Sequence, residues 1–140
     1  MRHRYMTAIV AAASVGATLS GCSSKECAGN ACASFGNATA RVVIDQRDQS
    51  ITGRITCGSE GGDKLTINVQ GPGTSRLNVE LAGSNVKDLL IVEDNVMYDS
   101  SADSNLKMTR DGNHYSFTGN LNQSGGSPAP SAVTVDVTCP

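Results

Sequence analysis

The stretch Val133-Thr-Val-Asp-Val-Thr-Cys139 alternates apolar and polar residues without a break. Because successive side chains of a strand point to opposite faces, this alternation predicts a strand with one buried and one solvated face. The stretch Ile51-Thr-Gly-Arg-Ile-Thr-Cys57 has the same pattern, with Ile51, Ile55 and Cys57 on one face. In both stretches the final cysteine continues the apolar set, so we expect both cysteines on buried faces.

Other short segments of the same character follow one another along the chain, with turn residues between them. The Asp111-Gly112 pair predicts a tight hairpin, because such residues accept positive φ. Residues 86–92 could instead form a buried turn of helix. The predicted strands are 41–45, 50–57, 64–70, 76–81, 86–92, 96–98, 106–110, 114–119 and 133–139. We therefore predict an all-β fold, a small antiparallel β-sandwich or open barrel of about eight or nine short strands.

Composition limits the classes of protein that the chain can belong to. Its 140 residues are 39% apolar, 4% aromatic and 17% charged. A charged fraction below the typical quarter argues against long charged helices or a coiled coil. Eleven basic residues against thirteen acidic ones leave no positive surplus to neutralise phosphates, so we expect no nucleic-acid binding. The length allows one domain.

The N-terminus has the pattern of a secretory signal. Arg2 and Arg4 precede an uncharged, mostly apolar segment over residues 7–19. As a helix this segment would span about 20 Å, which is less than the roughly 30 Å of a membrane core. It is followed by Leu19-Ser-Gly-Cys22, which resembles a bacterial lipobox, where the cysteine thiol receives a diacylglyceryl group and the chain is cleaved before it. We predict that residues 1–21 are a cleaved signal peptide and that Cys22 is the lipid attachment site.

The mature chain is predicted to have two parts. Residues 22–40 are small or polar apart from Phe35, which predicts a lipidated flexible tether, and residues 41–140 form the all-β domain. Cleavage removes two arginines, so the mature charge is 9 − 13 = −4. An acidic protein is not drawn to anionic lipid by its own charge, so the acyl chains must hold it at the membrane. We expect a lipid-anchored protein on the extracytoplasmic side of the cell membrane.

The cysteine count agrees with lipidation and export. Five cysteines are an odd number, and lipidation of Cys22 leaves four that can pair in three ways. The shared parity of Cys57 and Cys139 with buried residues favours a bridge between these two. Cys27 and Cys32 then form a local bridge, since a redox role is disfavoured by their C-x4-C spacing. A zinc site is disfavoured as well, because the mature chain has one histidine and no metal-ligand cysteine spacing.

Three groups of polar residues have the side chains that catalysis or metal binding would require. His114 shares a strand face with Ser116 and Thr118, and we interpret it as a solvent-facing histidine. The alternative is a Ser-His-acid arrangement, whose members meet only in space. Asp45 and Asp48 are interpreted as solvated turn carboxylates. A third group, whose spacing differs from that of an EF-hand loop, consists of Asp99, Asp103 and Asn105. We expect no catalytic residues, no metal and no cofactor.

Three stretches resemble the signature sequences of the mycobacterial 19-kDa lipoprotein antigen family: residues 41–57, 110–119 and 135–139. Together with the lipobox, the likeness covers nearly the whole chain. The resemblance implies a triacylated envelope lipoprotein, exposed as an antigen, with paired cysteines at the positions of Cys57 and Cys139. It also implies recognition of the acylated terminus by lipopeptide-sensing Toll-like receptors, and it implies no enzymatic reaction.

Two functions of different kinds follow. The first is a non-enzymatic, membrane-anchored envelope lipoprotein that displays its β domain as an antigen. The alternative is a carrier of envelope lipid or glycolipid, with an apolar cleft near residues 86–98. A domain of about 100 residues has little interior to spare for such a ligand. The sequence leaves the physiological ligand and the oligomeric state open.

Overall fold

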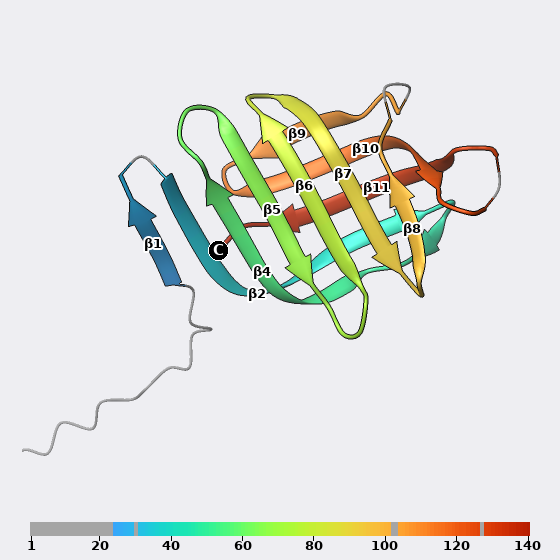
Figure 1. The fold of residues 1–140 in the computed structure, drawn as a ribbon, viewed down its shortest axis with the longest axis horizontal. Coiled ribbons are helices and arrows are strands. Elements are labelled where there is room, and N and C mark those ends of the chain that lie inside the picture. The colour runs from blue at the N-terminus through green and yellow to red at the C-terminus, as the bar shows by residue number, and fades with distance from the viewer. Residues whose placement is uncertain (1–23, 30, 102–103, 127) are drawn as a thin grey trace, which may run out of the picture.

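The computed structural model describes residues 24–29, 31–101, 104–126 and 128–140. Within these residues the chain forms eleven strands (Figure 1). They are β1 (Ser24–Ala28), β2 (Ala31–Ile44), β3 (Arg47–Asp48), β4 (Ile51–Ser59), β5 (Lys64–Gln70), β6 (Arg76–Ala82), β7 (Asn85–Glu93), β8 (Val96–Asp99), β9 (Lys107–Asp111), β10 (His114–Gln123) and β11 (Ser131–Thr138).

Eight of these strands close into an antiparallel barrel. The hydrogen-bonded order is β2-β11-β10-β8-β7-β6-β5-β4, and β4 pairs again with β2. Three further strands extend the ring: β1 and β3 pair with β2, and β9 pairs with β10. The all-β prediction is therefore confirmed, and the barrel is closed rather than open. Closure leaves fewer unpaired backbone groups at strand edges.

The alternating sequence pattern explains the core. In each strand, apolar residues at alternate positions face the interior of the barrel. Residues such as Ile55, Phe117 and Val135 have no exposed surface. Cys57 and Cys139 are 5% and 7% exposed and belong to the same cluster. Residues 86–92, the segment that could also have been helical, lie in β7. Among the described residues, no helix is long and apolar enough to cross a membrane.

The segment predicted as a flexible tether is different in the structure. Residues 24–28 form β1, and residues 31–40 form the first part of the long strand β2. This part of β2 pairs with β4 along its whole length, from Cys32 opposite Ser59 to Ala40 opposite Ile51. The prediction failed because main-chain pairing with β4, which closes the barrel, outweighs the weak strand propensity of small residues.

Candidate functional site

The predicted lipid attachment site, Cys22, lies outside the described residues. The described chain begins at Ser24, the first residue of β1, where Ser24 pairs with Phe35 of β2. Only Ser23 separates Cys22 from this strand in the sequence. An anchor on Cys22 would therefore join the membrane to the β1–β2 hairpin almost directly.

The hairpin is cross-linked by the bridge expected from the sequence. Cys27 and Cys32 are directly opposite in the register of β1 and β2, with their Cα atoms 4.0 Å apart, and form a disulfide. The described side chains of β1 are exposed, and β1 pairs with β2 alone. This disulfide therefore fixes an accessory hairpin and does not cross the barrel core.

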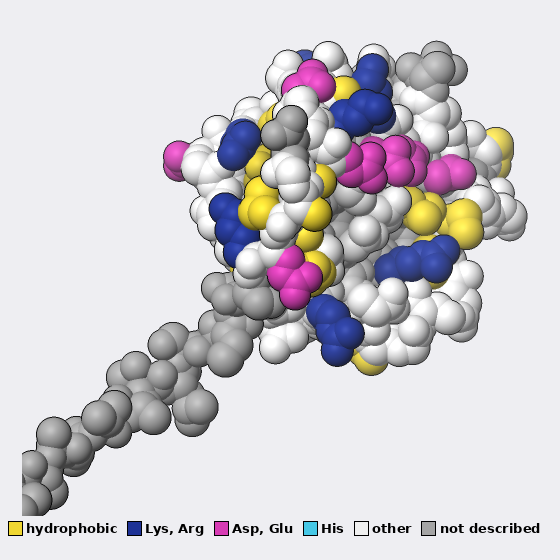
Figure 2. Space-filling view, turned by 60° about the vertical axis from the view of Figure 1, so that its left-hand side comes forward, with side chains coloured by type: hydrophobic (Ala, Val, Ile, Leu, Met, Phe, Trp, Pro, Cys, Tyr) yellow, Lys and Arg dark blue, Asp and Glu magenta, His cyan; other side chains and the backbone are white. Residues whose placement is uncertain are grey.

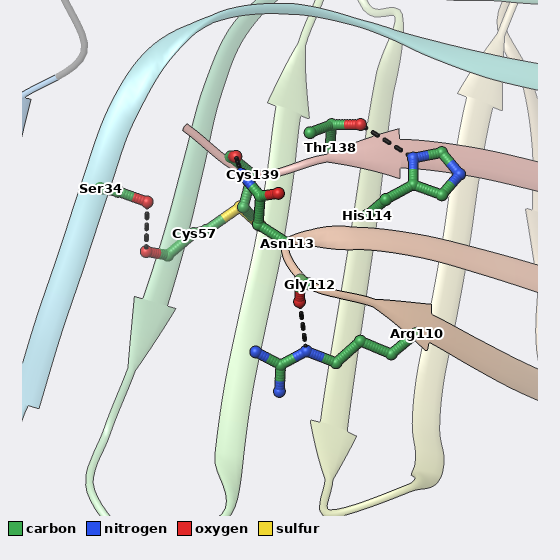
Figure 3. The surroundings of a disulfide bond; sticks show 8 residues. All are labelled: Ser34, Cys57, Arg110, Gly112, Asn113, His114, Thr138 and Cys139. Atoms are coloured by element: carbon green, nitrogen blue, oxygen red, sulfur yellow. Dashed lines mark hydrogen bonds between the residues drawn. A yellow bond between two sulfur atoms is a disulfide. The ribbon is translucent and has the colours of Figure 1, made fainter.

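The second predicted bridge joins distant parts of the chain. Cys57 of β4 and Cys139, directly after β11, form a disulfide across 82 residues of sequence, with a Cα–Cα distance of 5.9 Å (Figure 3). Two hydrogen bonds join Cys139, near the C-terminus, to Asn113. Cys139 N donates to the Asn113 carbonyl at 2.9 Å, and Asn113 Nδ2 donates to the Cys139 carbonyl at 2.6 Å. The chain terminus is thereby fixed to both β4 and the β9–β10 turn.

His114 lies in a cluster of polar side chains on the solvent face of β10 and β11. The backbone register sets His114 opposite Thr138 and Ser116 opposite Asp136. His114 Nδ1 lies 2.8 Å from Thr138 Oγ1, while Nε2 lies 3.4 Å from Ser116 Oγ and 3.6 Å from Asp136 Oδ1. Ser116 Oγ donates to Asp136 Oδ1 at 2.5 Å. Sequence reasoning found His114 and Ser116 but not Asp136, because only strand pairing brings this residue to them.

The order of contacts in this cluster differs from that of a catalytic triad. In a triad the serine hydroxyl donates to a histidine that a carboxylate orients through its other ring nitrogen. Here Ser116 donates to Asp136 itself, and the other ring nitrogen of His114 faces Thr138. The side chain of His114 is 45% exposed, so water has access to it. The cluster has the geometry of a cross-strand hydrogen-bond network on a solvated sheet face.

Asp45 and Asp48 belong to the turn region after β2. Asp45 and Gln46 have φ values of 47° and 67°, and Asp45 Oδ1 accepts a hydrogen bond from Ala132 N at 2.9 Å. Asp48 accepts hydrogen bonds from the hydroxyl and the backbone N–H of Ser50. These bonds, the hydroxyl first, lower the pKa of Asp48, and nearby Arg41 adds to the effect. Both carboxylates are exposed, and each accepts hydrogen bonds in the turn region, Asp45 from β11 and Asp48 from Ser50.

Of the third group of oxygen ligands, Asp99 and Asn105 are among the described residues. Asp99 ends β8, Asn105 lies in the following connection with a φ of 47°, and Asp103 lies outside the described residues. Across residues 24–29, 31–101, 104–126 and 128–140, no three His, Cys, Asp or Glu side chains are grouped so that they could hold a metal ion.

Two surface cavities bear on ligand binding. One, of about 490 Å³, lies beside the start of β7, and its described lining includes Lys87, Asp88 and Ser104 together with other polar groups. This is where the sequence predicts an apolar cleft for lipid, and the cavity is instead mainly polar. The other, of about 430 Å³, lies against the hairpin, with Ala33 and Gly58 among its small lining residues.

The fold and its cross-links define a class of small, disulfide-bonded β-barrel domains. The family model described as Mycobacterium 19 kDa lipoprotein antigen matches residues 33–139, which is most of the chain. The chain therefore belongs to the Mycobacterium 19 kDa lipoprotein antigen family, as the resemblance of its signature stretches predicts. A search of curated proteins found no match.

Proposed function

We propose that this lipoprotein antigen is held on the extracytoplasmic face of the cell membrane by acyl chains on Cys22, and that its barrel is a non-catalytic, displayed domain. The observation that carries the proposal is the family match over residues 33–139, on a chain whose residues 19–22 resemble a lipobox. Two or more acyl chains hold a protein stably at a bilayer, where one chain does not.

The non-catalytic part of the proposal is supported by the His114 cluster. Its serine donates to the carboxylate, and the contact with His114 Nε2 is longer at 3.4 Å, so the order of contacts is not that of a serine activated by a histidine base. Strand backbone N–H groups beside Ser116 are paired in the ladders with β9 and β11, which leaves this part of the sheet without free donors for an oxyanion.

The lipid-carrier alternative draws no support from the cavity beside β7, because acyl chains require an apolar lining. Native mass spectrometry of the purified protein tests it directly. A stoichiometric lipid that remains bound without being covalently attached would favour a carrier.

The anchor is tested by Cys22→Ala, with Ser23→Ala as the matched control at the next position. We expect the control to partition with membranes and to carry acyl groups on its N-terminal peptide by mass spectrometry. The Cys22→Ala protein should stay in the aqueous phase and should fail to stimulate cells that bear lipopeptide-sensing Toll-like receptors. Membrane partitioning by Cys22→Ala would refute the anchor.

A further inference from the structure

On the outer face of β1, β2, β4, β5, β6 and β7, acidic and basic side chains lie in separate rows across the strands. The strand register places side chains of this face in cross-strand rows. One row contains Glu26, Thr66, Glu80 and Asp88, linked through Ala33 and Gly58. Figure 2 shows a band of acidic side chains on this face, with basic side chains on both sides of it.

The next two rows lead from the acidic row toward the N-terminal end of β1. The first contains Phe35, which pairs with Ser24 on one side and Thr56 on the other. The second contains Arg54 and Arg76, joined through Gln70. Arg54 and Arg76 are exposed, and Phe35 is half-buried and lies outside the core cluster. We name Phe35, Arg54 and Arg76 the exit face, because the chain leaves the fold toward Cys22 at Ser24, which pairs with Phe35.

The reach of the chain connects this face to the anchor. Ser24 is the second residue after Cys22, so even a fully extended chain places Cys22 within about 7 Å of Ser24. Rows of the same face are also about 7 Å apart, because they are two residues apart along a strand. The greatest distance of Cys22 from Ser24 is therefore about the same as the spacing between the row of Ser24 and Phe35 and the row of Arg54.

The chemistry of the exit face matches the surface to which such an anchor would bring it. Arginine binds phosphate oxygens through a planar fork of N–H donors, and aromatic side chains favour the level of lipid headgroups. The acidic row is two rows, or about 13 Å, from the arginine row. That is beyond the Debye length of about 8 Å at physiological salt, so its repulsion of lipid phosphates is largely screened at Arg54 and Arg76.

We propose that the exit face docks on the phospholipid headgroups of the anchoring membrane, so that the barrel has a fixed orientation on the bilayer. The inference rests on the proposed acylation of Cys22. Phe35 lies at headgroup level, Arg54 and Arg76 contact lipid phosphates, and the His114 face of β10 and β11 remains in water.

The absence of tryptophan from the sequence allows a direct test. The acylated mature protein is reconstituted into phosphatidylethanolamine–phosphatidylglycerol vesicles with Phe35→Trp as its only tryptophan, and emission is quenched by lipids brominated near the headgroup end of the acyl chains. Thr109→Trp, exposed on β9, is the control. Asn37→Trp, at an exposed position in the row of Arg54, provides a second probe whose fold does not depend on replacing Phe35.

We expect at least twofold stronger quenching, with a blue-shifted emission, for the Phe35→Trp or Asn37→Trp probe than for Thr109→Trp. Adding Arg54→Gln and Arg76→Gln should reduce the quenching of the probe toward the control value while the protein still sediments with vesicles. Equal quenching of probe and control in vesicle-bound protein would overturn the docking and leave the anchor intact. Protein that remains in the supernatant would overturn the proposed anchor and the docking with it.

Discussion

Removal of the Cys57–Cys139 disulfide should lower the free energy of unfolding much more than removal of the Cys27–Cys32 disulfide. A cross-link stabilises a protein largely by restricting its unfolded chain, and the effect grows with the length of the closed loop. A separation of 82 residues corresponds to about 4.5 kcal/mol, and a separation of 5 residues to about 2 kcal/mol. The smaller value applies only to the hairpin, since β1 pairs with β2 alone and can detach while the barrel stays folded.

The test is urea denaturation of Cys57→Ala/Cys139→Ala and Cys27→Ala/Cys32→Ala, followed by far-ultraviolet circular dichroism. The first pair should lose about 2–5 kcal/mol, a large share of the 5–15 kcal/mol that is typical of a folded domain. The second pair should keep a midpoint close to that of the wild type. Equal losses for the two double variants would refute the reasoning, as would a wild-type barrel whose midpoint is insensitive to reductant.

Four further variants test the barrel packing and the turn after β2. Gly53→Ala should cost about 1–3 kcal/mol by urea denaturation, because its Cβ would collide with a backbone carbonyl at the end of β5. Phe117→Ala should cost about 3–5 kcal/mol at a fully buried position, whereas Thr118→Ala at the exposed neighbouring position should change stability by less than about 0.5 kcal/mol. Asp48→Asn should make the stability of the protein less sensitive to acid. The pKa of Asp48 is lowered from 3.8 in the folded state, so its stabilising contribution is present above about pH 4. That contribution is lost as the pH falls through the lowered pKa, and the variant has no such contribution to lose. These expectations would be contradicted by a Gly53→Ala midpoint equal to that of the wild type or by equal costs for Thr118→Ala and Phe117→Ala. They would also be contradicted by identical acid titrations with and without Asp48.

Strands whose two faces differ strongly in polarity could be predicted from the sequence. Leu65, Ile67 and Val69 alternate with polar residues, and β5 has the predicted bounds of residues 64–70. The first part of β2 gives no such signal, because its inward-facing positions are small: Cys32, Ser34, Gly36, Ala38 and Ala40. Main-chain pairing with β4 fixes this part of β2, and pairing partners distant in sequence are not encoded in local periodicity.

The polar cluster was only partly predictable for a related reason. The alternation of β10 places His114 and Ser116 on its solvent face, and Tyr115 and Phe117 in the core, as the sequence predicts. The partner Asp136 is twenty residues further along the chain and meets Ser116 only through the register of β10 and β11. The exit face was missed in the same way, since its three residues come from three different strands.

The barrel should open first at the junction of β8 and β10. Only two residue pairs join these strands, Asn122 with Asp99 and Gln123 with Tyr98, whereas nine pairs join β2 to β4. The β2–β4 region is held further by the Cys57–Cys139 bridge, which fixes β4 to the end of the chain. Local opening requires less free energy where fewer backbone bonds must break. Native-state hydrogen exchange should therefore show faster exchange for the amides that join β8 and β10 than for those that join β2 and β4. If both sets exchanged at one common rate under EX2 conditions, the barrel would open as a single unit, and the uneven distribution of pairing and cross-links would have no effect on its dynamics.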